Sequence, residues 1–316
     1  MDFGERTTRR SFLHDMGRVA AGAAIAGSSL RWSVPGEAPK APDLVVAHGN
    51  NAAAIVKKAV ELLGGMTRFV SKGDVVVVKP NIGWDRLPRQ AANTNPDTVV
   101  ALIELALQAG AKQVKVFDNP VIDNARAAYQ RSGIAEAAEK AGAQVKFPDN
   151  RLFKDIELKG EFLKRWPVYT EALDCDCLIN VPIAKQHAMA RLTMALKNHM
   201  GIVGGSRGEW HRSLDVALAE FAAFIKPKVK LTVLDAYRIL VRNGPTGGAA
   251  KDVEMPRKCI AGVDQVAVDA YGTSLFKDPS GAPLKPMELG YLVRAKEMGI
   301  GETDLSKLVI QEVEVA

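Results

Sequence analysis

Four short apolar segments that the sequence pattern predicts to be β-strands are each followed by lysine, asparagine, histidine or aspartate residues. These are Lys79 and Asn81 after residues 75–78, Asp118 and Asn119 after 114–117, Lys185 and His187 after 178–182, and Asp235 after 231–234. Open parallel sheets bind ligands beyond the carboxyl ends of their strands. We therefore expect these side chains to converge in one crevice, although aspartate and asparagine are also common turn and helix-cap residues.

A second signal is the clustering of histidines. His187, His199 and His211 fall within one short stretch of the chain, which also contains Lys197 and Asn198 on a predicted helix and a glycine-rich segment after them. Lysine side chains and glycine backbone N–H groups suit a phosphate or carboxylate. Alternatively, two or three of the histidines bind a metal ion.

These residues define a hypothesis about roles. His187 or His211 would act as general acid or base because histidine titrates near neutral pH. Asp235 would orient the base or help to bind a metal. A turn-rich loop at 243–248 is neither a Walker motif nor a dinucleotide fingerprint, but its glycines would line the same crevice. The ligand-binding residues in this hypothesis are Lys79, Asn81, Lys185, Lys197, Asn198, Gly247 and Gly248.

The elements that would position these residues alternate along the chain. Strands are predicted at 44–47, 74–78, 113–117, 144–147, 178–181, 231–234 and 308–313, and helices at 51–63, 96–109, 124–141, 189–199, 214–225, 263–276 and 284–296. Such alternation predicts an α/β fold with a mostly parallel sheet and helices on both faces. We expect a single α/β domain over 42–316, with a small inserted lobe at 148–172.

The beginning of the chain has the pattern of an export signal. Thr8-Arg9-Arg10-Ser11-Phe12-Leu13 places two arginines before Phe-Leu, and an Ala/Gly-rich apolar stretch and a Pro/Gly-rich linker follow up to residue 41. This order is typical of a cleavable twin-arginine signal, so the partner would be the twin-arginine export machinery and the location periplasmic or extracytoplasmic. The apolar stretch is shorter than the roughly 20 residues of a membrane span, so no permanent span is expected.

Composition limits the class of ligand and cofactor. The formal net charge of +6, from 42 basic and 36 acidic residues, suits a small anion but is too diffuse for a nucleic-acid surface. The chain has three cysteines, Cys175, Cys177 and Cys259, which are too few for a four-cysteine iron–sulfur cluster. Buried thiols, or a disulfide from Cys259 to one of the other two, are the two interpretations.

Several of these segments together resemble one known family, the bacterial and archaeal proteins grouped as domain of unknown function 362. The matching segments include Lys79-Pro80-Asn81, Thr94-Asn95-Pro96, Asn180-Val181-Pro182, Lys185-Gln186-His187, Ala195 to Gly201, His211, Leu234-Asp235-Ala236, Gly244-Pro245 with Gly247-Gly248, and Val266 to Ala270. The resemblance implies kinship without a substrate. Some members are described as iron–sulfur proteins, and this chain departs from them because it lacks their cysteines.

Three functions remain open at this point. The first is an enzyme acting on a small anionic metabolite, with the crevice as its active site. The second is an extracytoplasmic protein that binds a metal ion or an anion without catalysis. The third is a redox partner protein related to the iron–sulfur members of the family. Any cofactor would have to be held by His, Asp or Lys, and residues 185–211 are where we expect it.

Overall fold

One mixed, largely parallel sheet organises the computed structural model, which describes residues 41–316. Its main path follows the order β13-β1-β12-β10-β7-β2-β3-β4, and β8, β9 and β11 pair at its side. The strands are β1 (Leu44–Gly49), β2 (Val75–Pro80), β3 (Gln113–Val116), β4 (Gln144–Val145), β7 (Cys177–Val181), β8 (Ile183–His187), β9 (Arg191–Thr193), β10 (Val229–Leu240), β11 (Val253–Glu254), β12 (Lys258–Gly262) and β13 (Ile310–Val315). The fold class is the predicted α/β arrangement. The predicted export signal lies outside the described residues.

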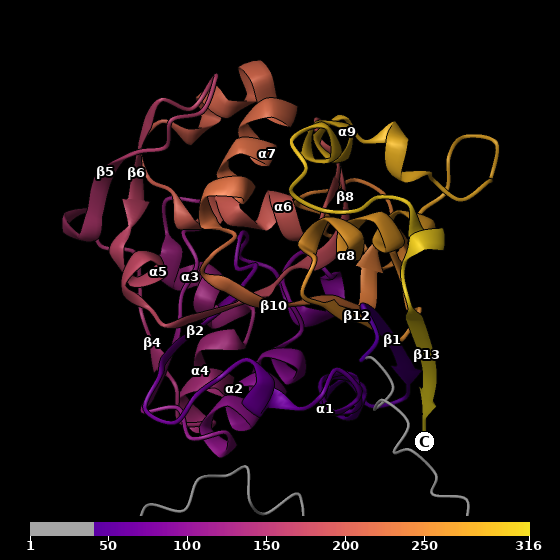
Figure 1. Cartoon of the computed structure of the whole chain (residues 1–316), viewed down its shortest axis with the longest axis horizontal. Coiled ribbons are helices and arrows are strands. Elements are labelled where there is room, and N and C mark those ends of the chain that lie inside the picture. Colours follow the sequence, from indigo (N-terminus) through magenta and orange to yellow (C-terminus); the bar gives the residue numbers. More distant parts are fainter. Residues whose placement is uncertain (1–40) are drawn as a thin grey trace, which may run out of the picture. The chain divides into compact units, whose positions relative to one another are not determined.

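Helices cover both faces of this sheet (Figure 1). One face carries α1 (Ala52–Leu62), α2 (Pro96–Gln108), α3 (Ala125–Arg131) and α4 (Ile134–Lys140), and the other carries α6 (Ala195–Asn198), α7 (Leu214–Ile225), α8 (Gln265–Gly272) and α9 (Gly290–Glu297). The short α5 (Thr170–Asp174) precedes β7. Each face has its own apolar core. Val76, Val77 and Val78 of β2 are fully buried because side chains from the two sides of the strand enter different cores.

Helix starts explain several of the polar residues between elements. The Asn51 side chain accepts a hydrogen bond from Ala54 N at the start of α1, and Asn95 accepts one from Asp97 N before Pro96 of α2. Asp264 does the same for α8, where it accepts from Val266 N and Ala267 N. These are ordinary N-caps, which satisfy backbone N–H groups that have no partner within the helix.

The predicted helix at 189–199 is wrong for most of its length. Residues 183–187 form β8, and the chain reverses to form β9, which pairs antiparallel with β8. Arg191 takes a left-handed conformation with φ of 60° at this reversal, which a helix does not allow. Helical structure is limited to α6 and the 3₁₀ turns at His199–Ile202 and Arg207–Ser213. Lys185 and His187 therefore lie within a strand and not in a loop after one.

Two further predictions need correction. The helix expected at 124–141 is interrupted at Gly133, whose φ of 73° separates α3 from α4. The strand expected at 231–234 is the twelve-residue β10, and its antiparallel neighbour β12 was not predicted. The second difference depends on tertiary pairing, which the local pattern does not report, whereas the first reflects a glycine inside the predicted helix.

Within residues 148–172 the chain forms a hairpin of β5 (Phe153–Glu157) and β6 (Arg165–Tyr169), a separate two-stranded sheet. A buried carboxylate on α7 holds its connecting loop. Glu220 accepts hydrogen bonds from Glu161 N at 2.5 Å and Leu163 N at 2.7 Å. The hairpin is therefore fixed to the helical layer by backbone donors around one side chain.

The three cysteines are all buried free thiols, and Cys259 is not bonded to either of the others. Burial raises the pKa of Cys175 to about 11. Because the thiolate is the reactive form, these thiols are inert. Within residues 41–316, no helix is both long enough and apolar enough to cross a membrane.

Candidate anion-binding site

A cavity of about 520 Å³ lies beside the carboxyl ends of β2 and β3 and against β8. Its lining comes from segments far apart in the chain: Asn81, Gly83, Trp84, Asp118, Asn119, Val121, Lys185, His187, Ala188, Met189, Thr193, Lys197, Asn198, Met200, Gly201, Gly205, Ser206, Arg207, Gly208, His211 and Pro245. Lys185, Lys197 and Arg207 are the cations of this lining, and Asp118 is its one carboxylate. The cavity therefore presents an excess of positive charge.

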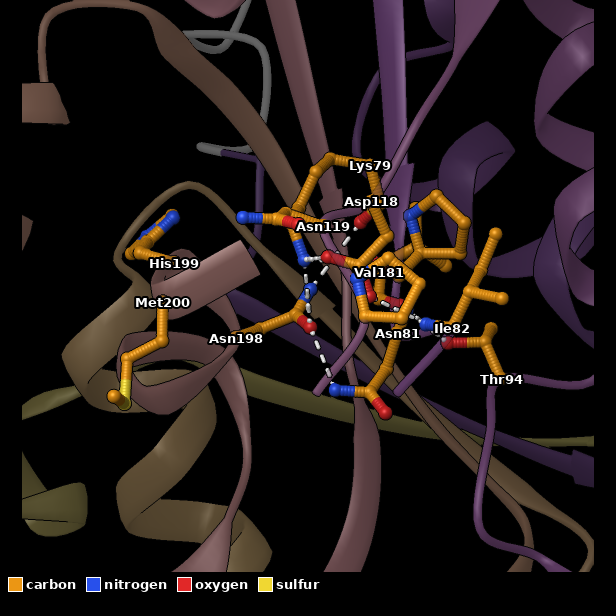
Figure 2. Close-up of polar contacts among 12 residues, drawn as sticks. Lys79, Asn81, Ile82, Thr94, Asp118, Asn119, Val181, Asn198, His199 and Met200 are labelled. Atoms are coloured by element: carbon orange, nitrogen blue, oxygen red, sulfur yellow. Dashed lines mark hydrogen bonds and ion pairs between the residues drawn. The ribbon is translucent and has the colours of Figure 1, made fainter. Parts of the chain in front are cut away.

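Asp118, which lines the cavity, forms an ion pair with Lys79, and Figure 2 shows the two side chains next to each other. Lys79 Nζ is 2.7 Å from Asp118 Oδ1, and both side chains are almost completely excluded from solvent. The other carboxylate oxygen, Oδ2, accepts from Ile82 N at 2.5 Å. Burial lowers the pKa of Lys79, while the charge of Asp118 acts in the opposite direction. Because each charge is compensated by the other, neither is free to attract a ligand.

Asn198 joins this pair to the cavity wall. Its Oδ1 accepts from Lys79 Nζ at 3.0 Å and from Asn81 Nδ2 at 3.1 Å, and its Nδ2 donates to Asn180 Oδ1 at 2.8 Å. Figure 2 shows Asn81 and Asn198 facing one another beside Lys79. Because both ends of its amide are hydrogen-bonded, Asn198 holds the side chains of Lys79 and Asn81 in place.

Lys185 is the second buried lysine, and its surroundings differ. Lys185 Nζ donates to Asn81 Oδ1 at 3.0 Å and to the carbonyl oxygen of Ala92 at 2.5 Å. Among residues 41–316 no carboxylate forms an ion pair with it. Burial lowers the pKa of Lys185 to about 7; the charge of Asp118 opposes this shift, and the positive charges of Lys197 and Lys79 add smaller contributions to it. A large fraction of this amine is therefore neutral at physiological pH.

Lys197 and Arg207 supply the more persistent positive charge. Burial, together with the nearby Arg207, lowers the pKa of Lys197 to about 8, so most of it remains an ammonium near pH 7. Arg207 donates to the carbonyl oxygens of Asn119, Met200 and Pro120. These three bonds use three of the five N–H groups of the guanidinium and connect the segment after β3 to the cavity. The acceptors are uncharged, so the positive charge of Arg207 is not neutralised by them.

The two cavity histidines have complementary hydrogen bonds. His187 Nδ1 accepts from Met189 N at 3.1 Å and Ala190 N at 3.2 Å, so its proton is on Nε2. His211 Nδ1 lies 2.9 Å from the carbonyl oxygen of Gly208, which requires a proton on Nδ1 and leaves Nε2 as an acceptor. The rings are roughly parallel, with centroids 6.5 Å apart. Burial, with the charge of Lys197, lowers the pKa of His187 to about 3 and keeps it neutral.

A buried carboxylate on the neighbouring helix positions α6. Asp269 of α8 accepts from Ala195 N at 2.6 Å and from Leu196 N at 3.0 Å. Burial raises the pKa of Asp269 to about 7 although these two N–H groups act against the shift. The bonds satisfy N–H groups of the first turn of α6, and so fix the direction in which Lys197 and Asn198 leave the helix.

The structure brings together six of the predicted site residues in the cavity lining, namely Asn81, Lys185, His187, Lys197, Asn198 and His211. Lys79 lies behind them. Asp235 does not line the cavity: its carboxylate accepts from Asn95 N at 2.7 Å and Tyr237 N at 3.1 Å, so it caps backbone instead of facing a ligand. Gly247 and Gly248 are also outside the lining, to which their loop contributes Pro245.

Several residues of the site were not predicted. Arg207 was visible only as one of many cations near the histidines, and Trp84, Met189 and Met200 gave no signal as ligand contacts. Asp118 was expected at the crevice, but not as the partner of Lys79. The Lys185 to Gly201 stretch was the strongest clue, since it holds much of the lining. His199 is not part of the lining: it is fully buried, and its Nε2 lies 2.6 Å from Gln265 Oε1.

Metal binding by two or three of the histidines was the alternative interpretation. Within residues 41–316, no three His, Cys, Asp or Glu side chains are grouped closely enough to hold a metal ion. His187 and His211 face each other without a carboxylate completing a set of ligands. The cavity is thus better described by its cations and its paired imidazoles.

Comparison with known proteins places the chain in a family. The sequence profile of the domain of unknown function DUF362 matches residues 76–274, which contain every cavity residue. The chain belongs to the DUF362 family. A thylakoid-associated protein of Synechocystis is 29% identical over 238 residues, which cover 73% of this chain and 72% of the relative.

Two solved structures share part of the arrangement. The lactate racemase apoprotein from Thermoanaerobacterium thermosaccharolyticum aligns with 72% of this chain at 11% identity and a TM-score of 0.42. A protein from Thermotoga maritima aligns with 68% of it at 14% identity and the same TM-score of 0.42. In both cases this DUF362 chain spans only 55% of the solved chain.

Proposed function

We propose that this DUF362 protein binds a small organic anion in the cavity beside β8 and transfers a proton to or from it. The observation that carries the proposal is the charge of the lining, where Lys197, Arg207 and a partly protonated Lys185 meet a single carboxylate that Lys79 already neutralises. Converging cations in a cavity partly shielded from water attract an anion more strongly than the same charges in water.

The size and the apolar part of the cavity favour an organic anion. Its volume of about 520 Å³ lies within the usual range of small-molecule sites. Trp84, Met189 and Met200 contribute apolar surface to the same lining as the cations. A metabolite with one carboxylate or phosphate group and a short carbon skeleton matches both features.

The histidines support proton transfer with distinct roles. His211 Nε2 has a free lone pair because its Nδ1–H is bonded to Gly208, so His211 is the candidate base. His187 is held as a neutral imidazole whose Nε2–H donates a hydrogen bond to the ligand. This assignment narrows the earlier expectation that either histidine would serve as acid or base.

Ligand screening by thermal unfolding and calorimetry tests the proposal. We expect small carboxylates or phosphates to raise the melting temperature, and Lys197→Met to weaken their binding by at least about tenfold, since a lost charged hydrogen bond is worth about 1.5–3 kcal/mol. Lys230→Met is the matched control because Lys230 is exposed and outside the cavity. Equal loss in both variants, or no stabilisation by any anion, would contradict the proposal.

We also propose that residues 1–41 direct twin-arginine export, which the Arg9-Arg10-Ser11-Phe12-Leu13 sequence supports. Fusion of residues 1–41 to a folded reporter should move the reporter out of the cytoplasm. An Arg9→Lys/Arg10→Lys double variant should retain it inside. Export that continues unchanged in the double variant would rule out this route.

A further inference from the structure

We propose that Lys185 is a nucleophilic amine that forms an imine with a carbonyl group of the bound anion, so the substrate class is a small oxo acid or aldehyde acid. This inference rests on the proposed anion site and adds covalent chemistry to it. It follows from the placement of Lys185 in the cavity lining and from the kind of partners that it has.

Hydrogen-bond geometry prepares Lys185 for this role. A neutral primary amine has two N–H groups and one lone pair. Lys185 Nζ has two acceptors, Asn81 Oδ1 and the Ala92 carbonyl oxygen, which match the two N–H groups. The lone pair then remains for a ligand. Both acceptors are uncharged, so they stabilise the ammonium form less than a carboxylate would.

The electrostatic surroundings act in the same direction. Burial, with smaller contributions from the nearby charges of Lys197 and Lys79, favours the neutral form and lowers the pKa of Lys185 to about 7, although the charge of Asp118 acts against this shift. Desolvation and a second cationic group are the general means by which a lysine becomes a nucleophile toward carbonyl compounds. The same Lys197 and Arg207 charges would hold the carboxylate of an oxo acid beside it.

The covalent step is balanced without an oxidant or reductant. The nitrogen lone pair forms a C–N bond while the carbonyl π pair moves to oxygen, which takes a proton from the Lys197 ammonium. Nitrogen loses one proton to this oxygen, the oxygen leaves as water, and the remaining nitrogen pair forms the C=N bond. The products are a protonated imine, one water molecule and the neutral amine of Lys197, while Arg207 keeps its charge beside the carboxylate.

Reductive trapping on the full chain tests this proposal. The protein is incubated with pyruvate or glyoxylate in the presence of sodium cyanoborohydride, digested, and analysed by mass spectrometry. We expect the peptide containing Lys185 to gain the mass of one reduced oxo acid, saturably and well above the level at exposed Lys230. Lactate should protect against the modification because it offers a carboxylate without a carbonyl.

Two variants and one internal control make the result specific. Lys185→Met and Lys185→Arg should both abolish the saturable adduct, and their melting temperatures show whether they are folded. Lys79, which is equally buried but paired with Asp118, should remain unmodified in the same digest. An adduct that is spread evenly over the lysines, or that persists in folded Lys185→Met, overturns the inference.

The outcome separates this inference from the proposed function. If pyruvate, glyoxylate and lactate raise the melting temperature but no adduct forms at Lys185, the imine proposal fails and the anion site stands. If none of the three stabilises the protein and none is trapped, both proposals fail for this class of ligand.

Discussion

Two buried lysines in neighbouring regions of this molecule have opposite environments. Lys79, at the end of β2, meets the carboxylate of Asp118 at 2.7 Å. Lys185, in β8, meets only uncharged oxygens and lines the cavity. Burial opposes the charge on both and the charge of Asp118 favours it on both, but only Lys79 forms an ion pair with that carboxylate. Partner chemistry, and not burial alone, therefore decides which lysine supports the scaffold and which one is available for a ligand.

Removal of the compensating anion should have the largest effect. Asp118→Asn leaves the buried Lys79 ammonium unpaired, and we expect a loss of about 3–5 kcal/mol in the free energy of unfolding. Urea unfolding measures this loss. The Lys79→Met/Asp118→Asn double variant should lose less than Asp118→Asn because no charge is left buried. A loss below about 1 kcal/mol in the single variant would show that the pair is not a structural requirement.

Crowding the same pair should be slightly less costly. A Cβ atom on Gly201 would lie 1.7 Å from Asp118 Oδ1 and 2.7 Å from Lys79 Nζ, so Gly201→Ala must displace the ion pair. We expect a loss of about 3 kcal/mol by urea unfolding, at the upper end of overpacking effects. Gly208→Ala is the control, since a Cβ there meets no atom within 4 Å. Similar behaviour of the two variants would contradict the close approach.

Lys185 should give a smaller effect per unit of pH, with a distinct pH dependence. Its folded pKa of about 7 lies below the ordinary 10.5, so the unfolded chain binds more protons between these values. Stability from this group therefore rises with pH across that window, by at most about 1.4 kcal/mol per pH unit. Lys185→Met lacks this rise and should be the more stable protein near about pH 6.

Urea unfolding of both proteins between about pH 6 and pH 10 measures the difference in their free energies of unfolding. The other titrating groups are common to both proteins, so their contributions largely cancel in this difference. Lys230→Met serves as the exposed control and should follow the wild type. Parallel curves for Lys185→Met and the wild type would mean that Lys185 keeps an ordinary pKa in the folded protein.

The smallest expected effect concerns the protonation of the two cavity histidines and is measured on the unsubstituted protein. In ¹⁵N-histidine NMR spectra, His187 should carry its proton on Nε2 and His211 on Nδ1, as their hydrogen bonds require. Because burial lowers the pKa of His187 to about 3, its signals should not move between about pH 5 and pH 8. Titration of His187 within that range would place it in a more polar environment than the cavity described here.

The sequence predicted the elements whose signals are local. The valines of β2, and Asn95 and Pro96 at the start of α2, behave as their types suggest because burial on both faces and helix capping act over a few residues. The same holds for the polar residues at the ends of β2 and β3, whereas Lys185 and His187 lie within β8 and Asp235 lies within β10. The family resemblance also held, and most of the expected ligand-binding residues lie around one cavity.

The predictions that failed depended on distant partners. β8 pairs with β10 and β9, and β9 lies within residues 189–199, where a helix was predicted. The local sequence pattern does not contain this pairing, so the strand could not be predicted from it. Asp235 was expected at the site, yet its carboxylate is used by the backbone of Asn95. Lys79 and Lys185 look alike in sequence, and the carboxylate that distinguishes them is contributed by Asp118 in the segment after β3.

The bond between Lys79 and Asn198 joins residues 119 positions apart. Contacts of such separation form late, because a long loop must close before they stabilise anything. During synthesis, β2 and β3 leave the ribosome well before α6 and Gly201 exist to cover the Lys79–Asp118 pair. A chain interrupted before residue 198 would therefore expose this charged pair and its apolar surroundings, and we expect such fragments to aggregate or be degraded rather than to bind ligand.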